Sequence, residues 1–172
     1  MQKLIDNQHR LPAEARRYGL RSSAVTGCGW VAIYNALELM GYHMEPQELI
    51  RFLEHQAPGV NGNFGTMLWS PAACLHRWGF PTGVTVRRER FDEAAKDAAV
   101  CILFYRWRNG MKFGAHFVAL HHTPEGFVGY NTFRNSVGPD RYGPSLEQWL
   151  RRRHYFGAVL TTVQPLKNKS GI

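Results

Sequence analysis

The chain has 172 residues, a length that suits one domain with a substantial hydrophobic core, and we expect residues 1–172 to form a single domain. It is 44% hydrophobic and 13% aromatic, which excludes a disordered protein. Its net charge of +8 comes from basic residues scattered in short groups, a pattern more typical of a solvated surface than of a nucleic-acid footprint. We therefore expect no nucleic-acid partner.

The cysteines and histidines do not form the patterns of a disulfide framework or a metal site. The chain has three cysteines, an odd number, and their spacing is not that of zinc ligands; they are Cys28, Cys74 and Cys101. His121 and His122 are adjacent on an expected strand, so their side chains point to opposite faces. The N-terminus lacks the apolar stretch of a secretory signal, and no apolar run reaches membrane-spanning length. We expect a cytoplasmic protein with no membrane segment, metal or cofactor.

The first half of the chain is predicted to be helical. Residues 1–25 are expected to be an irregular lead-in with one short helix from Pro12 to Tyr18. A helix beginning at Cys28 is apolar on nearly every side, which is typical of a helix in the core. Gly41 is a plausible residue for its C-terminal end, and Thr26 is a candidate N-cap.

Two more helices are expected before the second half. Proline lies near the start of each, at Pro46 for a helix over 46–53 and at Pro71 for a helix over 70–78. A loop rich in glycine separates them at 57–65. A strand at 82–86 and a short helix at 91–98 then lead into the second half.

The second half is predicted to consist mainly of strands. Runs rich in β-forming residues predict strands at 100–105, 115–121, 127–132 and 155–163, with turns at 108–113 and 123–126 and a helix at 145–153. Helices followed by a mostly antiparallel sheet indicate the α+β class.

Cys28 occupies a position that favours a reactive, nucleophilic thiol. Gly27 and Gly29 flank it and allow tight turning and close approach of other backbone. At a helix start, free N–H groups and the positive end of the helix dipole favour a thiolate and can hold a developing oxyanion. Most free cysteines are small buried hydrophobes, and this is our interpretation of Cys74 and Cys101.

A nucleophilic thiol needs a base, and His116 is our candidate. It lies early in an apolar strand, where it shares a face with Val118 and Leu120. A lone histidine in such a strand is usually a core residue. Here, however, the next strand of a hairpin brings Asn131 near the same end, and an asparagine side chain can accept from an imidazole N–H and orient the ring.

These residues resemble the papain-like cysteine peptidase superfamily. The chain looks most like the small bacterial branch that includes the peptidase domains cutting double-glycine leader peptides. The motifs are Gly27–Gly29 with Asn35–Leu37 on the same helix, the strand Gly114–Val118, and Asn131 on the next strand. The resemblance implies a papain-like fold, with the nucleophile helix packed on the sheet and a Cys-His-Asn triad at a cleft.

The sequence departs from that family at the oxyanion hole. Such enzymes commonly have a glutamine a few residues before the nucleophile, but the residue six positions before Cys28 is Ser22. Ser22, Ser23 and a displaced Gln8 remain candidate donors, and the backbone N–H of Cys28 is the alternative.

We therefore expect a papain-like cysteine hydrolase, a peptidase or amidase acting on a peptide or protein. Cys28 would be the nucleophile, His116 the base and then the acid, and Asn131 the orienter of His116. The reaction would pass through an acyl-enzyme on Cys28. Two alternatives stay open. One is an acyltransferase with the same triad, and the other is a non-catalytic interaction domain of the same fold with a basic surface. The oligomeric state is left open.

Overall fold

The computed structural model describes residues 4–11, 15 and 17–166. The helix expected from Pro12 to Tyr18 lies largely outside the described residues, and the tail expected at 167–172 lies wholly outside them. The last two positions of that expected helix form strand β1 (Arg17–Tyr18), which pairs antiparallel with β2 (Arg21–Ser22).

The α+β class is confirmed, with helices first and a sheet second. The helical part holds η1 (Gln8–Arg10), α1 (Ser23–Thr26), α2 (Cys28–Leu39), α3 (Pro46–Gln56) and α4 (Ser70–Arg77). The predicted helix beginning at Cys28 is therefore present, and nearly all of its side chains are buried. Gly41 follows its end with φ +81°, a conformation that glycine adopts without strain.

The predicted N-cap of this helix is wrong. Gly27 occupies the cap position of α2, without a side-chain hydrogen bond, because α1 runs directly into α2. Thr26 is instead the last residue of α1, and its hydroxyl donates to the carbonyl of Ser22. The first-turn N–H groups of α2 are thus left without a capping side chain.

The main sheet has six antiparallel strands in the order β3-β8-β4-β5-β6-β7. The strands are β3 (Thr82–Thr85), β4 (Val100–Asn109), β5 (Lys112–Thr123), β6 (Gly126–Tyr130), β7 (Asp140–Gly143) and β8 (Phe156–Val163). The connections contain η3 (Arg88–Arg90), α5 (Phe91–Lys96) and α6 (Leu146–Arg152).

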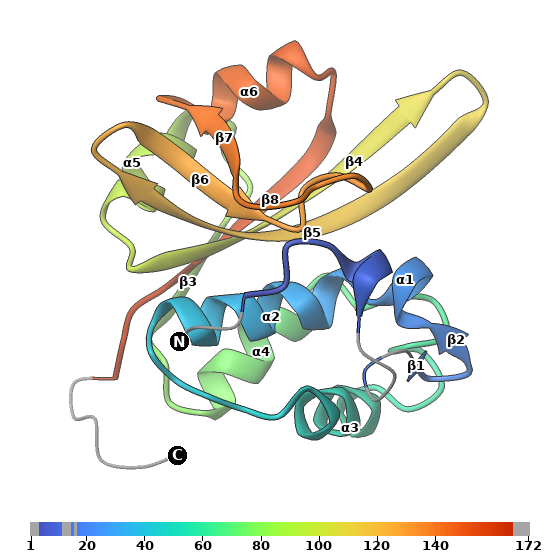
Figure 1. The fold of residues 1–172 in the computed structure, drawn as a ribbon. Coiled ribbons are helices and arrows are strands. Elements are labelled where there is room, and N and C mark those ends of the chain that lie inside the picture. Colours follow the sequence, from blue (N-terminus) through green and yellow to red (C-terminus); the bar gives the residue numbers. More distant parts are fainter. Residues whose placement is uncertain (1–3, 12–14, 16, 167–172) are drawn as a thin grey trace.

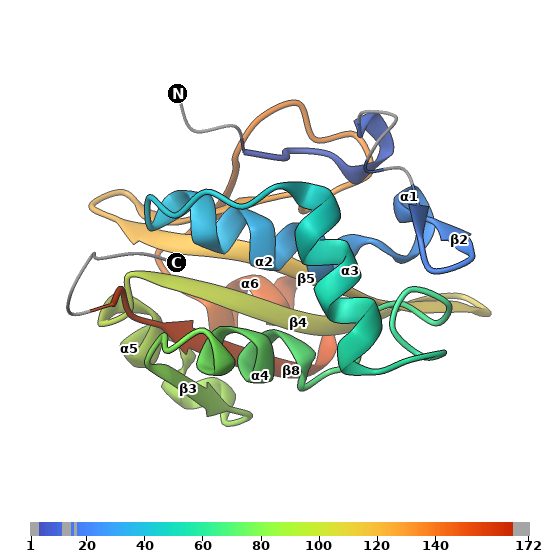
Figure 2. The same cartoon turned by 90° about the horizontal axis from the view of Figure 1, so that it is seen from below.

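The sheet separates two hydrophobic cores. The helices α1 to α4 lie on one face, and α5 and α6 lie on the other (Figure 1). Side chains of β5 alternate between the cores, with Phe117 and Ala119 facing the α2 side and Val118 and Leu120 facing the α5 and α6 side. Seen from below, α2 runs along β5, against which it packs (Figure 2). His116, two residues before Val118, belongs by this alternation to the α5 and α6 side.

Two parts of the sheet differ from the sequence prediction. The turn expected at 108–113 is much tighter, since the strands stay paired to Asn109 and Lys112 around Gly110 and Met111. The side chains at this end of the hairpin are largely exposed, so they lack the alternation of buried and exposed residues that would indicate a strand. The sequence predicts no strand between 132 and 145, where β7 lies; β7 pairs with β6, and the Tyr142 ring lies 4.2 Å, centroid to centroid, from that of Trp149 on α6.

Along residues 112–118, one edge of β5 has no strand beside it in the described part of the chain. β4 pairs with β5 from Lys112 onward, whereas the pairing of β6 with β5 begins only at Ala119. In a two-residue hairpin, the closing pair Asn109 and Lys112 exchanges hydrogen bonds, and every second residue after it does the same. The backbone N–H and C=O groups of Phe113, Ala115 and Phe117 therefore point to the open edge.

The described helices also bear on membrane insertion. None of those within residues 4–11, 15 and 17–166 combines the length and apolar character needed to cross a membrane.

Candidate active site

Cys28 is the first residue of α2, and both neighbouring glycines are required by close contacts. A Cβ added at Gly27 would clash with the carbonyl oxygen of Ser23 and lie 2.7 Å from Nε1 of Trp30. A Cβ added at Gly29 would clash with the side chain of Thr66. The Gly-Cys-Gly motif thus lets α1 and the loop carrying Thr66 pack directly against the start of α2.

The Cys28 thiol is half-buried and lies among backbone donors. Burial raises its pKa, while hydrogen bonds from the backbone N–H groups of Phe117, Gly29 and Cys28 itself lower it and only partly offset the burial. The expectation of an easily ionised thiol is therefore wrong for the resting protein, in which Cys28 is a neutral thiol. The Phe117 contact also puts this thiol at the open edge of β5, beside the residue that follows His116.

His116 is held from the far end of its ring. Its Nε2 lies 2.6 Å from the main-chain carbonyl oxygen of Asn131, and its ring packs edge-on against Tyr105 with 5.9 Å between centroids. Burial lowers the pKa of His116 and the neighbouring His9 lowers it further, whereas the bond to Asn131 raises it. His116 is therefore neutral near pH 7. A carbonyl can only accept, so Nε2 carries the proton and Nδ1 is the free base.

Asn131 contacts His116, but not in the way expected from the sequence. The side-chain amide that we expected to orient the ring is bonded to Gln8 instead: Oδ1 accepts from the Gln8 backbone N–H at 2.8 Å, and Nδ2 donates to Gln8 Oε1 at 2.9 Å. Asn131 follows the end of β6 with φ +63°, and in this conformation its carbonyl, not its side chain, bonds the imidazole. The group of Asn131 that bonds His116 is thus its main-chain carbonyl.

The three candidate oxyanion donors lie in different surroundings. The Ser23 hydroxyl is fully buried and accepts from Nε1 of Trp30 at 3.2 Å, which keeps it away from any substrate. The Ser22 hydroxyl is exposed and caps α1 by accepting from the Ala24 N–H. Gln8 is brought close to the site from 20 residues upstream of Cys28, with its Nε2 donating to the carbonyl of Ala24 at 2.9 Å. The backbone N–H groups of Cys28 and Gly29 remain beside the thiol itself.

The other cysteines lie in the interior. Cys74 and Cys101 are fully buried, and burial raises the pKa of both, that of Cys101 to about 12. Within residues 4–11, 15 and 17–166, His, Cys, Asp and Glu side chains form no group of three or more that is arranged to hold a metal ion.

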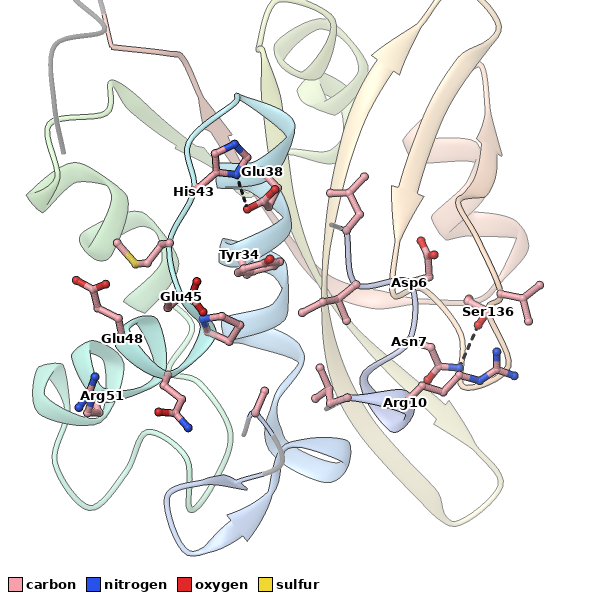
Figure 3. A pocket seen from close by; sticks show the side chains of 18 residues that line it. Asp6, Asn7, Arg10, Tyr34, Glu38, His43, Glu45, Glu48, Arg51 and Ser136 are labelled. Atoms are coloured by element: carbon pink, nitrogen blue, oxygen red, sulfur yellow. Dashed lines mark hydrogen bonds and ion pairs between the residues drawn. The ribbon is translucent and has the colours of Figure 1, made fainter. Parts of the chain in front are cut away.

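Two cavities lie near the N-terminal segment. A cavity of about 1080 Å³ opens between this segment, α3 and the last turns of α2, where it is lined by Tyr34 and Glu38 (Figure 3). It is at the opposite end of α2 from Cys28. A smaller cavity of about 290 Å³ borders Gln8, Ser22 and Ala24, next to the hydrogen-bonded groups around His116.

Sequence reasoning missed two parts of this arrangement. The Phe117 N–H contact to the thiol follows only from the position of α2 across the sheet. The pairing of Gln8 with Asn131 joins residues 123 positions apart. The one signal in the sequence was that Gln8 is a glutamine upstream of the cysteine.

Comparisons with known proteins found no match: no family model matches the chain, and neither does any curated protein sequence.

Proposed function

We propose that the protein is a papain-like cysteine hydrolase that cleaves an amide bond of a peptide or protein through an acyl-enzyme on Cys28. The observation that carries this proposal is the hydrogen bond between His116 Nε2 and the carbonyl of Asn131, which leaves Nδ1 as the free base. The thiol of Cys28 is bonded to the residue next to His116 on the same strand.

In the resting protein both Cys28 and His116 are neutral. The pKa of Cys28 is raised and that of His116 is lowered, so a proton must move from Sγ to Nδ1 as sulfur attacks the substrate carbonyl. Cys28 packs on the α2 side of the sheet and His116 lies on the α5 and α6 side, so the proposal requires Nδ1 to meet Sγ around the open edge of β5. The imidazolium, stabilised by the Asn131 carbonyl, then protonates the leaving amine, and water resolves the acyl-enzyme.

The start of α2 supplies the oxyanion hole. Attack by Sγ creates the oxyanion within reach of the backbone N–H groups of Cys28 and Gly29, which no side chain caps. The helix dipole adds a favourable field at the same point. This arrangement uses no side-chain donor from Ser22 or Ser23.

The open edge of β5 favours a peptide as the substrate. Phe113 and Ala115 present backbone N–H and C=O groups there and are exposed, on the same edge whose Phe117 N–H meets the thiol. An extended peptide can pair with such an edge, and its backbone would then run past Sγ.

Turnover of a fluorogenic peptide library tests the proposal. Cys28→Ala and His116→Ala are each expected to remove nearly all turnover, and the double variant is expected to be no worse than either, because the two groups act as a unit. Cys101→Ala and His122→Ala are matched controls, since Cys101 lies in the core and His122 is exposed farther along β5.

Full activity of Cys28→Ala would refute the proposal. A wild-type protein that binds library peptides with the same affinity as Cys28→Ala, yet turns none over, would point to the interaction domain instead. Product carrying an added amine, formed in preference to the free acid, would point to the acyltransferase.

A further inference from the structure

The N-terminal segment, residues 4–8, lies against α2 and is fixed to it by a buried asparagine. The Ile5 backbone N–H donates to Asn35 Oδ1 at 2.8 Å, and Asn35 Nδ2 donates back to the Ile5 carbonyl at 2.9 Å. Asn35 lies in the middle of α2 and is fully buried. These bonds satisfy the polar groups of a side chain that would otherwise be costly in an apolar helix.

Asn7, two residues after Ile5, fixes the segment to the loop after β6. Asn7 Nδ2 donates to the carbonyl of Arg134 at 2.8 Å and to that of Ser136 at 3.1 Å, the second of which is drawn in Figure 3. Asn7 Oδ1 accepts from the His9 N–H and starts η1. The segment thus reaches the region of Asn131 in a defined orientation.

Gln8 then holds Asn131 through both its main chain and its side chain. The two residues share two hydrogen bonds, and Gln8 Nε2 extends the chain to the carbonyl of Ala24. Gln8 is 6% exposed and Asn131 is 3% exposed, so water does not replace these bonds. A residue other than glycine with φ +63° is strained, and it persists where surrounding contacts over-determine it.

The same residue presents its carbonyl to His116. A rotation of the Asn131 backbone would carry the carbonyl oxygen away from Nε2, to which it lies 2.6 Å distant. Ala24, Gln8, Asn131 and His116 therefore form one continuous hydrogen-bonded chain, from the residues just before Cys28 to the base.

We propose that Gln8 is a positioning residue, which locks the Asn131 carbonyl on His116 and so fixes the Nε2–H tautomer that leaves Nδ1 as the base. This inference rests on the proposed function for its kinetic consequences, but the tautomer itself does not depend on turnover. The role differs from that of an oxyanion donor, because Gln8 acts through Asn131.

The direct test uses nitrogen NMR of His116 in a Cys28→Ala background, in which no chemistry occurs. Gln8→Met keeps the volume of the side chain but removes its acceptor and donor. We expect the Nε2–H tautomer to dominate in the parent protein and both tautomers to be populated in Gln8→Met. The pKa of His116 should fall, because the bond to Asn131 raises it. Gln148→Ala, an exposed glutamine on α6, is the control.

Kinetics supply a second test in the active protein. Gln8→Met should lower kcat by about 10- to 100-fold with little change in KM, as for a misplaced catalytic group, and its acid limb should move to lower pH. A merely structural role would lower the amount of active protein without moving the pH profile. Gln8→Met combined with Asn131→Ala should be no worse than the worse single variant.

Several results would overturn the proposal. An unchanged tautomer and an unchanged pKa of His116 in a folded Gln8→Met variant would show that Gln8 does not hold the Asn131 carbonyl on His116. Multiplicative kinetic effects of Gln8→Met and Asn131→Ala would mean that Gln8 acts independently, as an oxyanion donor does. A wild-type protein without turnover would refute the proposed function, and the NMR result would still decide the role of Gln8.

Discussion

Gly29→Ala puts two local effects in direct opposition. In a helix, alanine is more favourable than glycine by about 1 kcal/mol, so propensity alone predicts a more stable protein. The added Cβ would, however, lie 2.8 Å from Cγ2 of Thr66 and clash more closely with its Oγ1 and Cβ. Overpacking of this kind typically costs about 1–3 kcal/mol.

Thr66 is poorly able to move away. Its hydroxyl is hydrogen-bonded to that of Tyr18 at 3.1 Å, and Tyr18 is fully buried. Rotation of Thr66 would leave that buried hydroxyl without its partner, at a further cost of about 1 kcal/mol. We therefore expect a net loss of about 1–3 kcal/mol in the free energy of unfolding. In a chain of this size, that corresponds to a fall in Tm of roughly 2–4 °C for each kcal/mol.

The assay is urea unfolding followed by tryptophan fluorescence, with Thr66→Gly as the partner in a double-mutant cycle. Because Thr66→Gly removes the three atoms nearest to the new methyl group, the double variant should be more stable than the summed losses predict by about 1 kcal/mol or more. A stabilising Gly29→Ala, or simple additivity with Thr66→Gly, would refute the steric argument.

Three further predictions follow from the site and from α6. Turnover should fall as the pH drops through the pKa of His116, which lies below 6.5. At alkaline pH it should hold to about pH 9, because the pKa of Cys28 is raised. A loss of turnover on raising the pH only to 7.5 would contradict a pair that is neutral at rest. Iodoacetamide should alkylate Cys28 before Cys74 and Cys101, increasingly fast above pH 8 by mass spectrometry, and equal labelling in the folded protein would count against the site. Ser145→Ala removes the N-cap of α6 and should reduce the free energy of unfolding by about 0.5–2 kcal/mol in urea, whereas an unchanged midpoint would show that the cap is dispensable.

The elements that position the site were predictable because their signals are local. A helix beginning at Cys28 follows from an apolar run between glycines, and the strand of His116 follows from its β-forming residues. The alternation that pairs His116 with Val118 rather than Phe117 is a property of any strand. Each of these inferences uses residues within a few positions of one another.

The ionisation of Cys28 could not be predicted in the same way. The helix start favours a thiolate, and the backbone donors do lower the pKa as expected. Burial of the thiol raises its pKa by more. The extent of burial depends on the tertiary packing of segments far apart in sequence, so the position of Cys28 on a helix gave only the smaller of the two effects.

The sequence places Asn131 near His116, but the main-chain carbonyl of Asn131 makes the contact and its side chain does not. A hairpin predicts that Asn131 lies near His116, yet it does not decide whether the side chain or the carbonyl makes the contact. That choice depends on the φ of +63° at Asn131 and on Gln8, whose place beside it is set by the path of the N-terminal segment over α2. Hairpin geometry holds no information on either.

A main-chain orienter changes how substitutions at Asn131 should be interpreted. Asn131→Ala leaves the carbonyl in the chain, so its effect on His116 must come through the lost bonds to Gln8 and the strained φ rather than through a missing acceptor. For the same reason, Asn131→Asp is not equivalent to swapping one imidazole acceptor for another. In the proposed triad, Asn131 adopts positive φ after the strand next to His116, and the distant side chain of Gln8 helps to fix that conformation.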